Sequence, residues 1–320
     1  MQFVPQDDTT IERRSGRHRT HSVSETLKSG QTRPDPVALG FSGDEETGWT
    51  RAMRGHEVHF RLLRTLPDLV HAERLQEEVF GVSERDLIPA NELIVVSETG
   101  GAVIAAFLPG DLDRAVGVLL GWGGFVGRPR VVSDFLAIRP EARNYGLATE
   151  LKRLQAAVAL SRGFVEVVWT VDPLRAANAR LNFGKLGATA DHYEIDRYGP
   201  TFAASLYGGM PTDRLHVTWD IASPRVISRL RGQDDAPRPA MANYPAPFAP
   251  GMTDDAALIA VPADIDTLLA TRPDEALAWR LRLRETLCQA FTAGFVITGF
   301  RPAVGDAAPA YLLERRKARR

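Results

Sequence analysis

Residues 131–162 constrain the fold more than any other part of this 320-residue chain. An apolar run leads into the turn Arg143-Asn144-Tyr145-Gly146-Leu147-Ala148, and a sequence with helical periodicity follows. A glycine at a helix entry lets the backbone come close to a ligand, because it has no Cβ. The free N–H groups and the dipole of the helix start add partial positive charge. This pattern predicts a strand–turn–helix unit with an anion site suited to a pyrophosphate, with the permanent charge of Arg143 at its rim.

Composition narrows the class of protein. Hydrophobic residues make up 44% of the chain and charged residues 25%, as in globular proteins, and the net charge of -1 gives no basic field for nucleic acid or an anionic membrane. No run reaches the roughly 18 to 20 apolar residues that cross a bilayer, and the N-terminus lacks the apolar stretch of a secretory signal. Cys288 is the single cysteine, which excludes an intrachain disulfide. We expect a cytoplasmic monomer or homodimer with no nucleic-acid or membrane partner.

The chain divides by composition into four parts. Residues 1–55 contain few aliphatics and are expected to be a disordered extension. Residues 56–222 carry the periodic segments, 223–253 form a linker rich in Pro, Ala and Arg, and 254–320 form a segment too short for an independent core. The extension has two interpretations: a dispensable tail, or a basic arm for an acidic partner, built on Arg13, Arg14, Arg17 and Arg19.

Periodicity predicts an alternation of strands and helices. Strands are expected over residues 58–63, 93–97, 102–108, 116–122, 131–138, 164–171, 192–195 and 215–221, then 257–261, 295–300 and 310–314. Helices are expected over residues 67–80, 145–162, 172–186 and 273–293. Thr99-Gly100-Gly101 is a hairpin signal between two of the strands, and Asp172-Pro173 is a helix N-cap followed by proline. The expected fold class is therefore α/β (α+β).

Two motifs resemble the GNAT acetyltransferase superfamily. The Arg-x-x-Gly-x-Ala turn at residues 143–148 is similar to that family's Gln/Arg-x-x-Gly-x-Gly/Ala acyl-CoA motif, and it lies between a strand and a helix. One strand later, NARLNFGKLGA at residues 178–188 resembles the family's late helix with its Lys-Leu-Gly turn. More narrowly, residues 169–174, 185–188 and 211–214 look like a bacterial and archaeal branch described only as predicted GNAT acetyltransferases. The core resemblance covers residues 57–221.

The resemblance implies a twisted mixed sheet flanked by helices, whose two central strands splay apart to admit the pantetheine arm of acetyl-CoA. Residues 131–138 and 164–171 would be these strands, and a small C-terminal αββ segment would be an addition. Backbone groups of Leu136, Ala137 and Ile138 would pair with the pantetheine, and Asn178 would lie near the thioester end. The pyrophosphate would be held by Arg143 and by backbone N–H groups of Asn144, Tyr145, Gly146, Leu147, Ala148 and Thr149. Small residues at 146 and 148 also suit plain helix–sheet packing.

The implied chemistry is direct transfer from acetyl-CoA, as co-substrate, to a neutral amine, which requires a base or a water chain. Asp134, in an apolar strand where the branch commonly has histidine, is a candidate base. The tyrosine that many relatives use as thiol acid is Phe183 here, so Tyr193 or water is the candidate acid. Asp172 has an N-cap interpretation beside a catalytic one. The seven histidines and the cysteine show no metal-ligand spacing, so no metal is expected.

The sequence therefore predicts an acyl-CoA-dependent, and specifically acetyl-CoA-dependent, N-acyltransferase. Its acceptor would be an unidentified small-molecule or peptide amine, which the fold does not specify. Two alternatives stay open: a catalytically inactive CoA-binding sensor or interaction module, and a scaffold for the C-terminal segment that binds no CoA.

Overall fold

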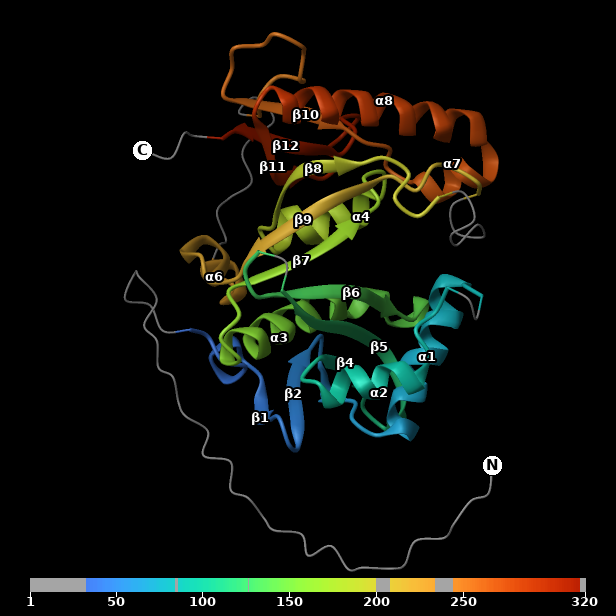
Figure 1. Ribbon diagram of the computed structural model, residues 1–320, viewed down its shortest axis with the longest axis vertical. Coiled ribbons are helices and arrows are strands. Elements are labelled where there is room, and N and C mark those ends of the chain that lie inside the picture. The colour runs from blue at the N-terminus through green and yellow to red at the C-terminus, as the bar shows by residue number, and fades with distance from the viewer. Residues whose placement is uncertain (1–32, 84–85, 126, 200–207, 234–243, 317–320) are drawn as a thin grey trace, which may run out of the picture. The chain divides into compact units, whose positions relative to one another are not determined.

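A computed structural model describes residues 33–83, 86–125, 127–199, 208–233 and 244–316 (Figure 1). By internal contacts the chain divides into residues 1–32 and residues 33–320, and every described residue belongs to the second unit. The basic arm expected around Arg13 to Arg19 lies outside the described residues.

The described residues build one mixed sheet with the strand order β1-β2-β3-β4-β5-β6-β7-β9-β8-β11-β12-β10 (Figure 1). Its strands are β1 (Ser42–Asp44), β2 (Gly48–Met53), β3 (His56–Leu62), β4 (Ala102–Leu108), β5 (Asp111–Gly124), β6 (Arg130–Ile138), β7 (Glu166–Val171), β8 (Thr189–Glu194), β9 (Arg214–Asp220), β10 (Ala256–Ala260), β11 (Phe295–Arg301) and β12 (Ala310–Arg315). All ladders are antiparallel except the one between β6 and β7. The mixed α/β class expected from the sequence is confirmed.

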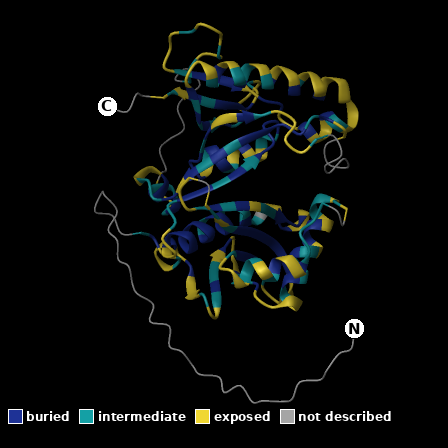
Figure 2. Ribbon diagram, viewed as in Figure 1, coloured by how far each residue is buried: buried dark blue, intermediate teal, exposed yellow. Residues whose placement is uncertain are grey.

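Helices cover both faces of the sheet. They are α1 (Leu66–Phe80), α2 (Ala90–Glu98), α3 (Leu147–Ser161), α4 (Ala176–Ala179), α6 (Pro224–Leu230), α7 (Ile265–Thr271) and α8 (Pro273–Thr292), with 3-10 turns η1 (Val37–Leu39) and η2 (Pro140–Tyr145) and the π-helical η3 (Arg180–Lys185). Along β4, Ile104 and Ala106 enter the core shared with α3, whereas Val103 and Ala105 enter the core shared with α1 and α2. Because strand side chains alternate between faces, α3 and the α1–α2 pair lie on opposite sides. Figure 2 shows how much of α3 is buried.

The segment before residue 56 corrects the expected disorder over residues 33–55. It forms η1 and the β1–β2 hairpin, and β2 pairs with β3 from Trp49–Phe60 to Met53–His56. Phe41 is 2% and Trp49 3% exposed. The hairpin is rich in polar residues, so its composition resembles that of a disordered segment. The aromatic side chains of Phe41 and Trp49 are the sequence features that indicate a folded element.

Residues 93–97 are a second correction, because they belong to helix α2 and not to a hairpin strand. Short apolar runs are ambiguous by periodicity alone, and here side chains of α1 decide the outcome. Gln76 exchanges hydrogen bonds with both backbone groups of Ile88, at 2.9 Å each, and the Glu73 carboxylate accepts from the N–H of Ala90 at 2.5 Å. These hydrogen bonds satisfy backbone groups just before α2 and at its first residue.

The expected linker and C-terminal segment are also better defined in the structure. Residues 223–231 are not linker: Ser223 caps α6, and Val226, Ile227 and Leu230 of that helix are buried. Residues 256–315 add β11, β12 and β10 to the sheet beside β8, and α8 packs on β8, β10 and β11. The C-terminal segment therefore continues the main sheet.

Trp49 gives a test of the corrected N-terminal boundary. Trp49→Ala should lower the free energy of unfolding by about 3–5 kcal/mol, because it empties a buried aromatic site. The matched control is Phe125→Ala, whose ring is 77% exposed and whose loss should change stability by less than about 0.5 kcal/mol. Urea denaturation of both variants measures this, and equal small effects would show that the hairpin is not part of the core.

Candidate active site

The parallel strands β6 and β7 form a fork. They share only the pairs Val131–Val167 and Val132–Val168. Beyond these pairs the two strands separate toward their carboxyl ends, as the diverging arrows in Figure 1 show. The other edge of β7 stays fully paired with β9 from Glu166 to Val171. The splayed pair expected from the resemblance is present.

A β-bulge in β6 lies just past the last pair of the fork. Strand β5 pairs Gly121 with Ser133, and its next pair involves Leu136, so Asp134 and Phe135 together oppose one residue of β5. A bulge of this kind re-aims backbone groups and increases the local twist. The divergence of β6 from β7 therefore starts where β6 carries an extra residue.

The backbone of Leu136, Ala137 and Ile138 pairs with β5 on one side only. In an interior strand, alternate residues direct their N–H and C=O groups to opposite neighbours. On the side of β7 these groups have no ladder partner within the described strands, which leaves them available to pair with amide groups. This is the strand segment predicted to contact pantetheine.

The predicted anion turn lies directly after β6. Gly146 has φ +81°, and a Cβ placed there would meet only Met53 Cε, at 3.8 Å. Gly146 is also the N-cap residue of α3 and provides no side-chain cap, so the first N–H groups of α3 have no side-chain partner. Arg143 is exposed, and Thr149 N–H bonds only back to Gly146, at 3.1 Å. The turn thus has backbone N–H groups without a side-chain cap and one exposed cation beside them.

The N-terminal hairpin supports this turn. Arg51 of β2 forms an ion pair with Glu150 of α3 at 3.2 Å, and His56 of β3 lies against the Tyr145 ring with centroids 5.5 Å apart. The sequence did not predict this contact, because residues 33–55 were expected to be disordered.

Asp134, the predicted base, lies in the bulge and is exposed to solvent. Partial desolvation by the surrounding protein raises the pKa of its carboxyl. A raised pKa makes a carboxylate a better proton acceptor near neutral pH. Of the predicted base Asp134 and the predicted acid Tyr193, Asp134 is the one at the fork.

Lys152 of α3 also reaches the fork, and the sequence reading missed it. Its Nζ donates to Ser133 Oγ at 2.8 Å, lies 3.4 Å from Gln155 Oε1, and sits 3.9 Å from the centroid of the Trp169 ring. The residue is 3% exposed. Burial lowers the pKa of the amine to about 7. A lysine one residue after Leu151 on an amphipathic helix looks like a surface charge, so only the tertiary structure identifies it.

Tyr193 lies away from the fork, on β8. Its hydroxyl donates to Asp213 at 2.6 Å, and Arg284 of α8 binds the same carboxylate through two bonds of 2.8 and 2.9 Å. Burial, followed by the hydrogen bond to Asp213 and the charge of that carboxylate, raises the pKa of the Tyr193 hydroxyl. Phe183 is fully buried against Tyr311. Asn178, on α4, is exposed.

Asp172 corrects the expected N-cap. The following helix begins only at Ala176, and Asp172 Oδ1 accepts from Leu174 N–H at 2.9 Å while Oδ2 pairs with the fully buried Arg280 of α8 at 2.8 Å. Burial acts to raise the pKa of Asp172, but the Arg280 charge outweighs it and the pKa is lowered. The C-terminal segment is thereby attached to the carboxyl end of β7.

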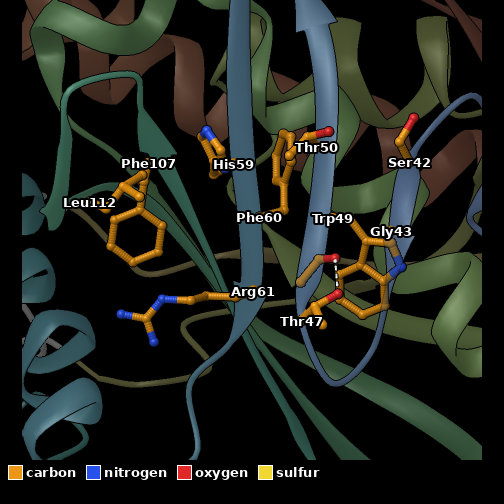
Figure 3. A pocket seen from close by; sticks show the side chains of 11 residues that line it. Ser42, Gly43, Thr47, Trp49, Thr50, His59, Phe60, Arg61, Phe107 and Leu112 are labelled. Atoms are coloured by element: carbon orange, nitrogen blue, oxygen red, sulfur yellow. Dashed lines mark hydrogen bonds between the residues drawn. The ribbon is translucent and has the colours of Figure 1, made fainter.

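Two cavities among the described residues lie away from the fork. One, of about 300 Å³, is lined by β1, β2 and β3 residues with Phe107 and Leu112 (Figure 3). Another, of about 380 Å³, lies over β8, β9, β11 and β12. Neither contains a residue of β6, α3 or β7. Within the described parts of the chain there is no cluster of His, Cys, Asp or Glu suited to a metal ion, and no helix long and apolar enough to span a membrane.

Comparison with known proteins gives similarity at the level of structure. The sequence matches no protein-family model, and no curated protein matches it. Similar solved structures include a GNAT-family acetyltransferase from Streptococcus pneumoniae, with 16% identity and a TM-score of 0.40, over 50% of this chain and 97% of that one. The ribosomal-protein-S18-alanine N-acetyltransferase from Escherichia coli has 16% identity and a TM-score of 0.40, over 52% and 95%. An N-acetyltransferase from Staphylococcus aureus Mu50 has 16% identity and a TM-score of 0.41, over 51% and 98%. Each of these likenesses covers about half of this chain and nearly all of the other.

The buried amine of Lys152 should leave a signature in the pH dependence of stability. Its folded pKa of about 7 lies below the 10.5 of an ordinary lysine, so above pH 7 the unfolded chain binds more protons and stability rises with pH, by up to about 1.4 kcal/mol per unit. Lys152→Met should lose this rise. Urea denaturation between pH 7 and 9 tests it, with the exposed Lys185→Met as a control that keeps the wild-type slope. Parallel pH profiles for all three proteins would contradict the buried amine.

Proposed function

We propose that this protein is an acyl-CoA-dependent N-acyltransferase that binds acetyl-CoA in the β6–β7 fork and transfers the acetyl group directly to an amine. The observation that carries the proposal is the fork itself, with a bulge at its apex and an uncapped helix start beyond its open end. The acceptor is a small-molecule or peptide amine.

The donor fits this arrangement in two parts. The pyrophosphate binds the backbone N–H groups from Asn144 to Thr149, and Arg143 supplies a charge-assisted contact. The pantetheine amides pair with the free side of Leu136, Ala137 and Ile138, as a peptide adds to a strand edge. Asn178 contacts the arm or the thioester end.

The transfer needs no covalent enzyme intermediate. The neutral amine attacks the thioester carbonyl, its proton passes to the Asp134 carboxylate, and the C–S bond breaks as the amide forms. A backbone N–H of the bulged strand stabilises the oxyanion. The raised pKa of Asp134 supports its role as base.

A second candidate is a CoA-binding module without transferase activity. It is favoured by the state of the two positions from which the acid was expected, since Phe183 has no hydroxyl and the Tyr193 hydroxyl is bound to Asp213. Free-thiol release from acetyl-CoA across a panel of amines separates the two candidates, because a binding module releases none.

Arg143 provides the test of donor binding. Arg143→Ala should weaken acetyl-CoA binding about tenfold, because it removes a charged hydrogen bond to phosphate. Arg74→Ala is the matched control, an exposed arginine on α1, and should bind like the wild type. Isothermal titration of the three proteins measures this. No binding by the wild type at high micromolar acetyl-CoA would rule out the proposed function, and equal affinities would locate the phosphates elsewhere.

A further inference from the structure

Lys152 occupies the apex of the fork. Ser133, which its amine contacts, directly follows the last paired residue of β6, and Trp169, which its amine faces, directly follows the last paired residue of β7. The lysine thus spans the two strands at the point where they part. Its side chain comes from α3, which packs on one face of the sheet.

The buried amine of Lys152 has neutral neighbours and no counter-ion among the described residues, which is unusual for a protein core. Among the described residues no carboxylate forms an ion pair with Lys152, and the contacts of Nζ are a hydroxyl, an amide oxygen and an indole face. Gln155, 2% exposed, leaves its Nε2 without a partner. The absence of a side chain at Gly121 makes room for it, because a Cβ there would lie 2.5 Å from that atom. A methionine would fill this space at less cost, so a buried amine and an unpaired amide point to a polar ligand atom.

The proposed function indicates which atom that is, and the inference rests on it. The pyrophosphate lies at the start of α3, and the pantetheine arm runs back along β6 from Ile138 toward the bulge. The sulfur of the thioester therefore lies toward Ser133, at the apex. Ser133 faces α3, since its hydroxyl accepts from Lys152.

We infer that Lys152 is the proton donor to the CoA thiolate, acting through the hydroxyl of Ser133. When the C–S bond breaks, the Ser133 hydroxyl gives its proton to sulfur and takes one from the Lys152 ammonium. The proton of the attacking amine goes to Asp134. After the amide and CoA leave, Lys152 regains a proton and Asp134 loses one by exchange with solvent, so the cycle balances.

Two buried tyrosines of the described residues are already engaged by other groups. The Tyr193 hydroxyl donates to Asp213, and the fully buried Tyr311 hydroxyl donates to the carbonyl of Pro173 at 2.7 Å. The position where the family resemblance places a tyrosine is Phe183. A lysine whose pKa burial brings to about 7 has the acidity that the step requires near neutral pH.

The experiment uses CoA with its free thiol, bound to the full-length protein. The ultraviolet absorbance of the thiolate is titrated with pH for wild type, Lys152→Met and the control Lys185→Met, after calorimetry shows that each binds CoA. The bound thiol should have a lower pKa in the wild type and in Lys185→Met than in Lys152→Met, by the roughly 1–3 pH units expected for an opposite charge within about 4–6 Å. Equal thiol titration in CoA-bound wild type and Lys152→Met would overturn the proton donor. Failure of the wild type to bind CoA would instead reject the proposed function.

A measurement on the unmutated protein covers the case in which Lys152→Met does not fold. The chain has four lysines, so lysine side-chain carbon signals can be followed by NMR during a pH titration. Linkage is reciprocal, so bound CoA thiolate must raise the pKa of Lys152 by as much as the ammonium lowers that of the thiol. A lysine signal titrating near pH 7 should move to higher pH when CoA is added. A signal that titrates identically with and without bound CoA would overturn the inference.

Discussion

The short parallel ladder between β6 and β7 is the constraint on which the rest of this structure depends. Two residue pairs hold the strands together, and past Val132 the edge of β6 that faces β7 has no ladder partner. Backbone N–H and C=O groups are almost always satisfied, so such an edge needs water or a ligand with its own amides. The bulge at Asp134 and the π-helical η3 after β7 add irregular backbone around the fork, as is common near functional sites.

Local chemistry explains what the sequence could predict. The turn at Gly146 and the helix after it follow from glycine and periodicity, the splaying of the two strands follows from the family resemblance, and all are present. Leu93 to Ser97 and the hairpin around Trp49 could not be predicted in this way. Their conformation is set by contacts outside each segment: with Glu73 and Gln76 of α1 for the first, and with the adjacent β3 and the distant α3 for the second.

The residues of the candidate site likewise differ in whether the sequence alone could identify them. Asp134 was visible in the sequence because a carboxylate in an apolar strand is unusual. Lys152 was invisible because its three neighbours come from β6, β7 and the next turn of α3, and no spacing rule connects them. Its burial is a property of the fork and not of the helix.

The C-terminal segment restricts the chemistry available to the fork. Arg280 and Arg284 of α8 bind Asp172 at the end of β7 and Asp213 beside β9. Removing one partner of a buried ion pair leaves the other charge buried without a counter-ion, which is strongly destabilising. These ion pairs therefore fix α8 against the sheet. Since Asp213 also accepts from Tyr193, the same pairing that attaches α8 to the sheet keeps that phenol protonated and engaged. Under the proposed function, Tyr193 is therefore replaced as acid by the pair inferred above, Lys152 and Ser133, which meet on the α3 side of the sheet.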